Sequence, residues 1–106
     1  MYTQKDHDLV NRLLTAARDG KTEWLPTAYE NVFTTSLSGK YSFQVRHNFL
    51  STPHFYLSIH DEEGKVIHNL TSDDYPDLEE LHELARRRAL KIDNTIDDIL
   101  TELDAQ

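Results

Sequence analysis

Apolar residues recur every three or four positions near the start of the chain and predict a helix over residues 4–19. Leu9, Leu13 and Ala17 follow this spacing, which is typical of an amphipathic helix. Thr3 precedes them with an acid three residues on, a pattern that resembles a capping box. Gly20 comes next and favours the left-handed conformation that ends many helices.

The hydrophobic period changes to two after residue 30 and predicts a hairpin over residues 32–45 with its turn at Gly39. Two registers are open. A two-residue loop would pair Thr34 with Phe43, and a three-residue loop would pair Phe33 with Phe43. The second is favoured because it sets two aromatic side chains opposite each other on one face of the sheet.

Two further alternating segments predict a third strand over residues 55–60 and a fourth over residues 66–70. The intervening Asp-Glu-Glu-Gly at 61–64 is typical of a type I turn whose glycine is left-handed. This turn is expected to pair Ile59 with Ile67, both facing the core. The four strands together predict an antiparallel meander.

Apolar residues step by three and four again from Leu78 to Leu103 and predict a C-terminal helical segment that Asp77 caps. The poor helix formers at 93–95 predict a break near residues 90–93. The whole pattern predicts one α+β domain over residues 1–106. In this fold an N-terminal helix and the C-terminal helical segment pack on one face of a four-stranded antiparallel sheet.

Composition narrows the classes of function. Nineteen acids against eleven lysines and arginines give a net charge of −8, which disfavours nucleic acid as a partner. The acidity is interpreted first as solubility and second as a match for a basic partner. The absence of cysteine excludes disulfides and thiolate chemistry and favours a reducing compartment, the cytoplasm. No signal peptide or membrane-spanning run is recognised.

Candidate chemistry is sparse. His60 and His68 are expected to be diagonal neighbours on one sheet face, where two imidazoles are weak candidates for a metal site. An ordinary pair of surface histidines is the favoured interpretation. The acid pairs at 73–74 and 97–98 are expected in solvent, which disfavours acid–base catalysis. No nucleophile motif or glycine-rich loop is present, so no catalytic residue and no cofactor is predicted.

Arg88 stands out within the run of three arginines at 86–88. Glu83, one turn earlier on the helix, can pair with either of the first two arginines, but no acid on the same helix can reach Arg88. We expect Arg88 to pair with an acid elsewhere in the fold or in a neighbouring subunit. This structural role is favoured over binding of an anion.

Residues 81–90 read Leu-His-Glu-Leu-Ala-Arg-Arg-Arg-Ala-Leu, followed by Ile-Asp at 92–93 and Ile-Asp-Asp-Ile-Leu at 96–100. This segment resembles the end of a group of small uncharacterised prokaryotic domains, and the likeness extends to the hairpin at 39–41 and the turn at 61–64. The resemblance implies a helix–sheet–helix order and a microbial origin. It implies no activity.

Three functions stay open. The leading hypothesis is a non-enzymatic protein-interaction or regulatory module, with self-association through a sheet face that holds Tyr56, Val66 and Leu70. The second is an acidic protein of the chaperone or immunity type that binds a basic partner. The third, a small metal-dependent enzyme that uses histidine and aspartate, is the least favoured.

Overall fold

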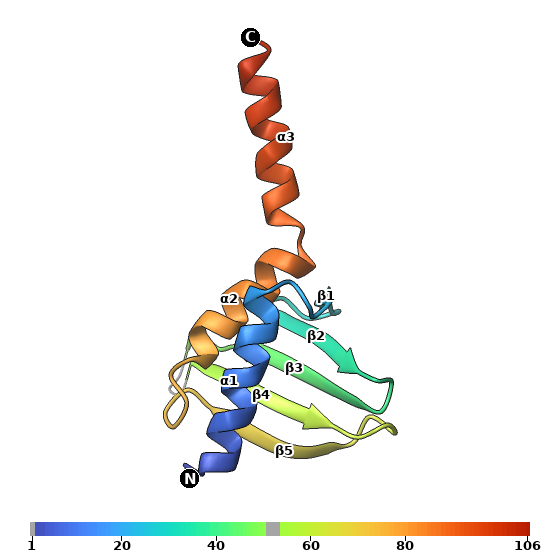
Figure 1. Ribbon diagram of the computed structural model, residues 1–106, viewed down its shortest axis with the longest axis vertical. Helices are drawn as coiled ribbons and strands as arrows, with labels where there is room; N and C mark the ends of the chain where they lie inside the picture. Colours follow the sequence, from blue (N-terminus) through green and yellow to red (C-terminus); the bar gives the residue numbers. More distant parts are fainter. Residues whose placement is uncertain (1, 51–53) are drawn as a thin grey trace.

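Within residues 2–50 and 54–106, which the computed structural model describes, three helices accompany a five-stranded antiparallel sheet (Figure 1). The helices are α1 (Gln4–Arg18), α2 (Leu78–Ala89) and α3 (Ile92–Asp104). The strands are β1 (Leu25–Pro26), β2 (Val32–Leu37), β3 (Tyr41–His47), β4 (Phe55–His60) and β5 (Val66–Thr71), and they follow one another across the sheet. The predicted α+β class and antiparallel sheet are confirmed, but the sheet has five strands where four were expected.

The additional strand is β1, at the edge of the sheet. Its two residues pair with β2, Leu25 opposite Thr34 and Pro26 opposite Phe33. A strand of two residues carries no alternating pattern. It also ends in proline, which cannot donate to a ladder and is confined to sheet edges. The sequence therefore lacked the signal that identifies a strand.

The N-terminal helix begins and ends as its sequence predicted. Thr3 Oγ1 accepts a hydrogen bond from the backbone N–H of Asp6 at 3.1 Å. At the other end, Gly20 is left-handed with φ of 70°, and the N–H of Lys21 donates to the carbonyl of Ala16. This is the Schellman arrangement that a left-handed glycine permits.

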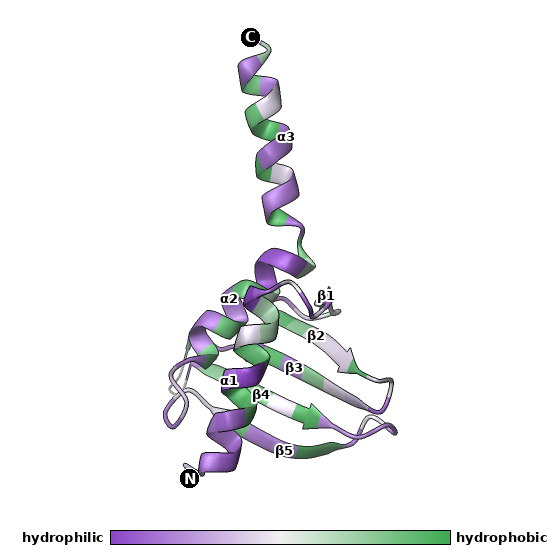
Figure 2. Cartoon of the chain, viewed as in Figure 1, coloured by the Kyte–Doolittle hydropathy of each residue, from purple (hydrophilic) through white to green (hydrophobic). Residues whose placement is uncertain are grey.

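One face of the sheet forms the core. One row of paired residues across β2 to β5 is wholly apolar, namely Phe33, Val45, Leu57 and Leu70. Helices α1 and α2 lie over this face of the sheet (Figures 1 and 2), and both bury side chains against it. The core includes Phe33, Phe43, Val45, Leu57 and Leu70 from the strands, Val10 and Leu14 from α1, and Leu78, Leu81 and Ala85 from α2. Trp24 and Tyr75 close its edges.

The other face of the sheet contains a polar row. Thr34, Gln44, Ser58 and Asn69 lie opposite one another across four strands. Leu70, expected on this open face, belongs instead to the core and is 3% exposed. Of the three apolar residues expected on the open face, only Tyr56 and Val66 remain there, and self-association through this face stays a prediction.

Both hairpin registers differ from expectation. Phe43 lies opposite Thr35, because Ser38 and Gly39 both take positive φ in the first turn and shift the pairing. In the second hairpin Ile59 lies opposite His68, and an irregularity between Ile59 and His60 displaces the strand. Each hairpin has one turn residue or bulge that the alternating pattern does not encode.

The C-terminal helical segment breaks where predicted. Lys91 is left-handed with φ of 54°, and it separates α2 from α3. Asp77 precedes α2 as predicted, but its side chain makes no capping hydrogen bond, and α3 has no side-chain cap either. Beyond Lys91, α3 projects from the body and buries no residue, so that the molecule measures 54 Å along its longest axis against 31 and 26 Å (Figure 1). Of the two C-terminal helices, only α2 packs on the sheet.

Candidate functional site

The main feature of the molecule outside its core is an apolar stripe along α3. Its members recur at helical spacing on one side of the helix, and they give the green segments along α3 in Figure 2. All but the first are 41–60% exposed. We call them the α3 stripe: Ile92, Ile96, Ile99, Leu100 and Leu103. An amphipathic helix usually packs such a stripe against its own domain. Here the stripe faces solvent.

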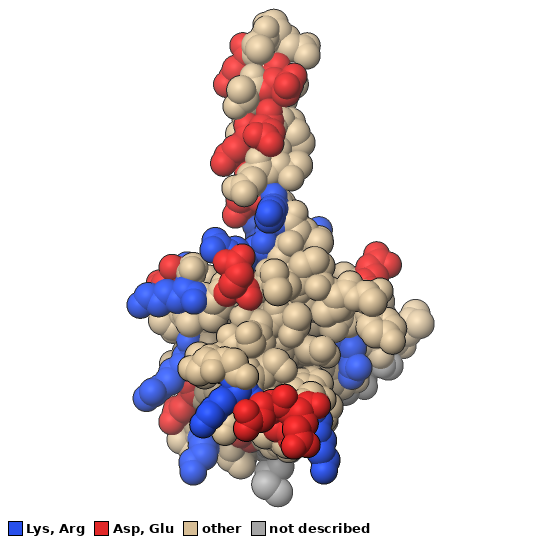
Figure 3. Space-filling model, turned by 90° about the vertical axis from the view of Figure 1, so that its right-hand side faces the viewer, with Lys and Arg blue, Asp and Glu red and all other residues tan. Residues whose placement is uncertain are grey.

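Acids occupy the rest of α3. The helix carries five acids and no lysine, arginine or histidine, and acids line the side of α3 seen in Figure 3. These are Asp93, Asp97, Asp98, Glu102 and Asp104. None of them interrupts the stripe, because the 3.6-residue period places all five on the flanks or the back of the helix. The result is a helix with one apolar side and a polar side on which acids predominate.

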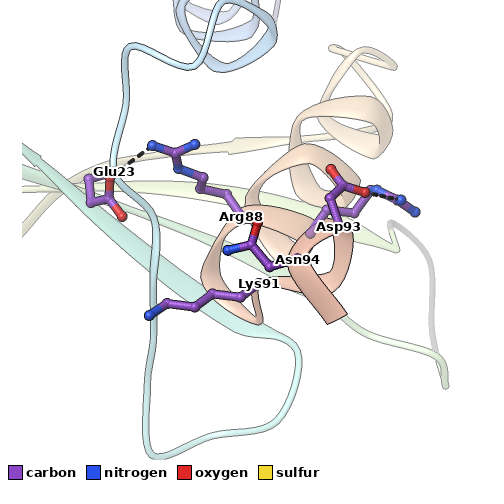
Figure 4. Close-up of a pocket in the computed structure, with 6 residues that line it drawn as sticks. Glu23, Arg88, Lys91, Asp93 and Asn94 are labelled. Atoms are coloured by element: carbon purple, nitrogen blue, oxygen red, sulfur yellow. Dashed lines mark hydrogen bonds and ion pairs between the residues drawn. The ribbon is translucent and has the colours of Figure 1, made fainter. Parts of the chain in front are cut away.

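The α2–α3 junction is basic. Four cations precede α3 within six residues, namely Arg86, Arg87, Arg88 and Lys91. Arg86 donates to Glu83 at 3.1 Å, and Arg87 pairs with Asp93 at the start of α3. Within the described residues, the Lys91 ammonium makes no ion pair or hydrogen bond. It extends away from Asp93 (Figure 4).

A hollow of about 270 Å³ lies at this junction (Figure 4). Its lining comes from α2, from the start of α3 and from the segment before β1, and comprises Glu23, Arg87, Arg88, Lys91, Asp93 and Asn94. Two of its three cations are already paired with its two acids. The hollow therefore resembles a network of surface ion pairs more than a preformed pocket for an anion.

Arg88 lies in this hollow and reaches an acid far away in the sequence. Its Nη2 donates to Glu23 Oε2 at 3.1 Å, and the two residues are 65 positions apart. The arginine side chain is 50% exposed and that of the glutamate 68% exposed. Such an exposed pair contributes about 0–1 kcal/mol. Its contribution to stability stays a prediction.

The structure does not bring His60 and His68 together. His60 Nε2 lies 3.0 Å from Ser58 Oγ on the open face of the sheet. His68, paired with Ile59, points to the helix face, where its Nε2 lies 3.2 Å from the carboxylate of Asp6 on α1. The expectation of a shared face is wrong, because the irregularity in the hairpin turns His68 over.

Asp6 is the centre of a small polar network at the start of α1. Burial acts to raise the pKa of its carboxyl, but hydrogen bonds with His68, Thr3 and Tyr75 outweigh burial, so that the pKa is lowered. The Tyr75 hydroxyl also accepts from the backbone N–H of Thr3 at 2.9 Å. This network fixes the start of α1 against β5 and the segment before α2, which is a structural role.

A second group of histidines gathers at the end of the sheet under α2. The ring of His47 stacks on Phe55 at 4.3 Å between centroids and lies 5.6 Å from His82. His82 is 4% exposed, and its Nε2 donates to the carbonyl of Asn31 at 2.9 Å. Burial lowers the pKa of His82 below its ordinary value of 6.5. The neutral imidazole thus serves as a core residue.

Little in the described part of the chain suggests catalysis. No three histidine, aspartate or glutamate side chains there are grouped so that they could hold a metal ion. No buried side-chain polar atom among these residues lacks a hydrogen-bond partner. His82, the histidine among these residues whose pKa is shifted, uses its Nε2 in a hydrogen bond to a backbone carbonyl. The α3 stripe with its basic junction is therefore the leading candidate for a functional site.

Comparison with known proteins adds no assignment: no family model, curated protein or solved structure matches the chain. Within the described residues, every helix is too short or too polar to cross a membrane.

Sequence reasoning located α3 but not its exposure. The stripe repeats as regularly as the apolar positions of α2, so the pattern alone predicts packing for both helices. The one available signal was the break near Lys91, which frees the direction of the second helix. Nothing in the spacing of His47, His54 and His82 indicated that these residues would gather at one end of the sheet.

Proposed function

We propose that this chain is a non-enzymatic protein-interaction module whose binding element is α3. The observation that carries the proposal is a complete amphipathic helix that contributes nothing to its own core. An apolar helix face laid against an apolar surface of another polypeptide is a recurring mode of recognition, read through anchors at i, i+3, i+4 and i+7. Ile96, Ile99, Leu100 and Leu103 have this spacing.

The energetics favour coverage of the stripe. Full burial of one leucine or isoleucine side chain stabilises by about 1.5–3 kcal/mol. The α3 stripe has five such side chains, four of them about half exposed. Covering them would recover on the order of 1 kcal/mol each, or roughly 5 kcal/mol in all. That gain is comparable to the lower range of the cost of association.

The length of α3 leads to the same proposal. Isolated helices shorter than about 12–15 residues are marginal in water, and most helical stability in proteins comes from tertiary packing. α3 has 13 residues, begins after a left-handed lysine and has no side-chain cap. A helix of this kind becomes firmly structured when a partner covers its apolar side.

Photo-crosslinking in the native host tests the proposal. A photoreactive amino acid at Leu100, within the stripe, should give covalent adducts with another polypeptide. The same group at Thr101, on the back of the helix, is the matched control and should give far fewer. If both positions give no adduct, or give the same adducts in equal yield, the stripe is not a binding surface.

A further inference from the structure

The repeat along the α3 stripe suits one particular partner. Ile92, Ile96, Ile99 and Leu103 are separated by four, three and four residues. This is the a/d spacing of a coiled-coil seam, with Ile96 and Leu103 at a and the other two at d. We infer that the polypeptide that covers α3 is the α3 of a second copy of this chain, in an antiparallel two-fold pair. This inference rests on the proposed function.

The antiparallel register follows from the repeat. In such a pair an a residue of one helix packs against a d residue of the other. Ile96 of each copy then meets Ile99 of the other, and Ile92 of each meets Leu103 of the other. All four seam positions hold isoleucine or leucine. The two-fold axis passes between residues 97 and 98. The same patch serves both copies, as a two-fold interface requires.

The distribution of charge favours the antiparallel arrangement over the parallel one. In each copy the junction at the start of α3, which we call its base, is basic and holds Arg87, Arg88 and Lys91. The C-terminal end of α3, which we call its tip, is acidic and holds Glu102 and Asp104. A parallel pair would set tip beside tip and base beside base. An antiparallel pair sets each acidic tip beside the other copy's base, within about one helical turn of its Lys91. Lys91 is the junction cation that has no acid of its own within the described residues.

The remaining acids do not oppose the pairing. Asp97 and Asp98 lie nearest the two-fold axis, but they are rotated by roughly 115° and 145° from the centre of the stripe. Both carboxylates therefore point to solvent, where salt screens their repulsion. Asp93, at the base, is already paired with Arg87. No acid has to enter the apolar seam.

The seam is short, so the pair is weak. Two helices of 13 residues meet over four layers, which is small beside interfaces of standard size. We expect a dissociation constant on the order of 0.01–1 mM. Because α3 projects outward from the body (Figure 1), a second α3 can lie along it. The antiparallel pairing then sets the two bodies at opposite ends of the pair.

Sedimentation equilibrium of the purified full chain over a concentration series is the direct test. The weight-average mass should rise from 12.4 kDa toward twice that value. Ile99→Asp, at the seam, should keep the chain monomeric throughout, a loss of at least about a hundredfold in affinity. Thr101→Asp adds the same charge on the back of the helix and should dimerise as the wild type does. Circular dichroism checks that both variants keep their helices.

Two variants with the same change in net charge, placed at different positions on α3, test the antiparallel arrangement. Glu102→Lys with Asp104→Lys reverses the tip, and Asp97→Lys with Asp98→Lys makes the same change in net charge at mid-helix. The tip variant should weaken the dimer by about three- to tenfold, whereas the mid-helix variant should leave it unchanged or strengthen it. If both variants strengthen the dimer equally, net charge alone governs association and the antiparallel pairing is wrong.

The outcomes separate this inference from the proposed function. A chain that stays monomeric at every concentration, or associates to a mass other than twice its own, overturns the second-copy inference. If Leu100 still crosslinks to a different polypeptide in the native host, a basic protein with an apolar groove for instance, the proposed function stands without it. If neither dimer nor adduct forms, both are wrong.

Discussion

Removing α3 should leave the rest of the fold intact. Ending the chain after Lys91 deletes the whole helix, and no residue of α3 is buried. The deletion removes one exposed ion pair, Arg87 with Asp93, which is worth about 0–1 kcal/mol. We therefore expect the free energy of unfolding to change by less than about 1 kcal/mol. Helical circular dichroism should fall by about a third, because α3 supplies 13 helical residues beside 15 in α1 and 12 in α2.

The assay is urea unfolding of dilute protein, followed by the fluorescence of the buried Trp24. Leu81→Ala is the control, because it gives the loss in free energy of unfolding that follows when a core side chain is removed. Leu81 is fully buried, so its truncation should cost about 2–5 kcal/mol. A loss of more than about 2 kcal/mol on deletion of α3, or a transition that is no longer cooperative, would refute the view that α3 stands apart from the core.

Two further predictions concern single side chains of the body. Arg88→Ala should lower the urea midpoint slightly, which corresponds to a loss of at most about 1 kcal/mol in the free energy of unfolding. A double-mutant cycle with Glu23→Ala should give a favourable coupling of about 0.2–1 kcal/mol. An unchanged midpoint would show that Arg88 has no structural role. His82 has a lowered pKa in the folded protein, so the unfolded chain takes up the proton first as pH falls. Its contribution to stability is complete above its ordinary pKa of 6.5 and is lost as pH falls from there toward the lowered pKa. His82→Gln should flatten the pH dependence of the urea midpoint between about pH 7 and 5, and an equally steep dependence in the variant would contradict this assignment.

Much of the fold could be predicted because the strongest local signals agree with the tertiary structure. The cap at Thr3 and the left-handed glycine at position 20 bound α1 within a residue of expectation. The segment 55–60 forms a strand with its predicted limits. The break in the C-terminal segment falls at Lys91, inside the predicted interval. In each case backbone preferences and hydrophobic period favour the same conformation.

Strand register could not be predicted because it depends on backbone conformations that the side-chain pattern does not encode. Ser38 takes a positive φ that glycine usually takes, and Phe43 pairs with Thr35, two residues further along β2 than the favoured partner Phe33. The irregularity after Ile59 turns His68 toward α1, where it meets Asp6. A shift of one residue moves a side chain to the other face of the sheet. His60 and His68 therefore lie on opposite faces and not on one face as expected.

The candidate site was hidden for a different reason. An apolar stripe that binds another polypeptide and one that packs on its own domain have the same period in sequence. What distinguishes α3 from α2 is direction, which a single left-handed residue, Lys91, determines. The excess of acids on α3 fits this difference, because an exposed helix has room for charge all around its stripe.

Amide hydrogen exchange of the dilute full chain measures whether α3 has a partner within its own domain. The amides of α2, at Leu81 and Ala85 for example, should be strongly protected, since these residues are fully buried. The amides of Ile96 and Ile99 should exchange with little protection and gain protection as protein concentration rises. Protection of α3 equal to that of α2 in dilute protein would mean that α3 packs on its own domain.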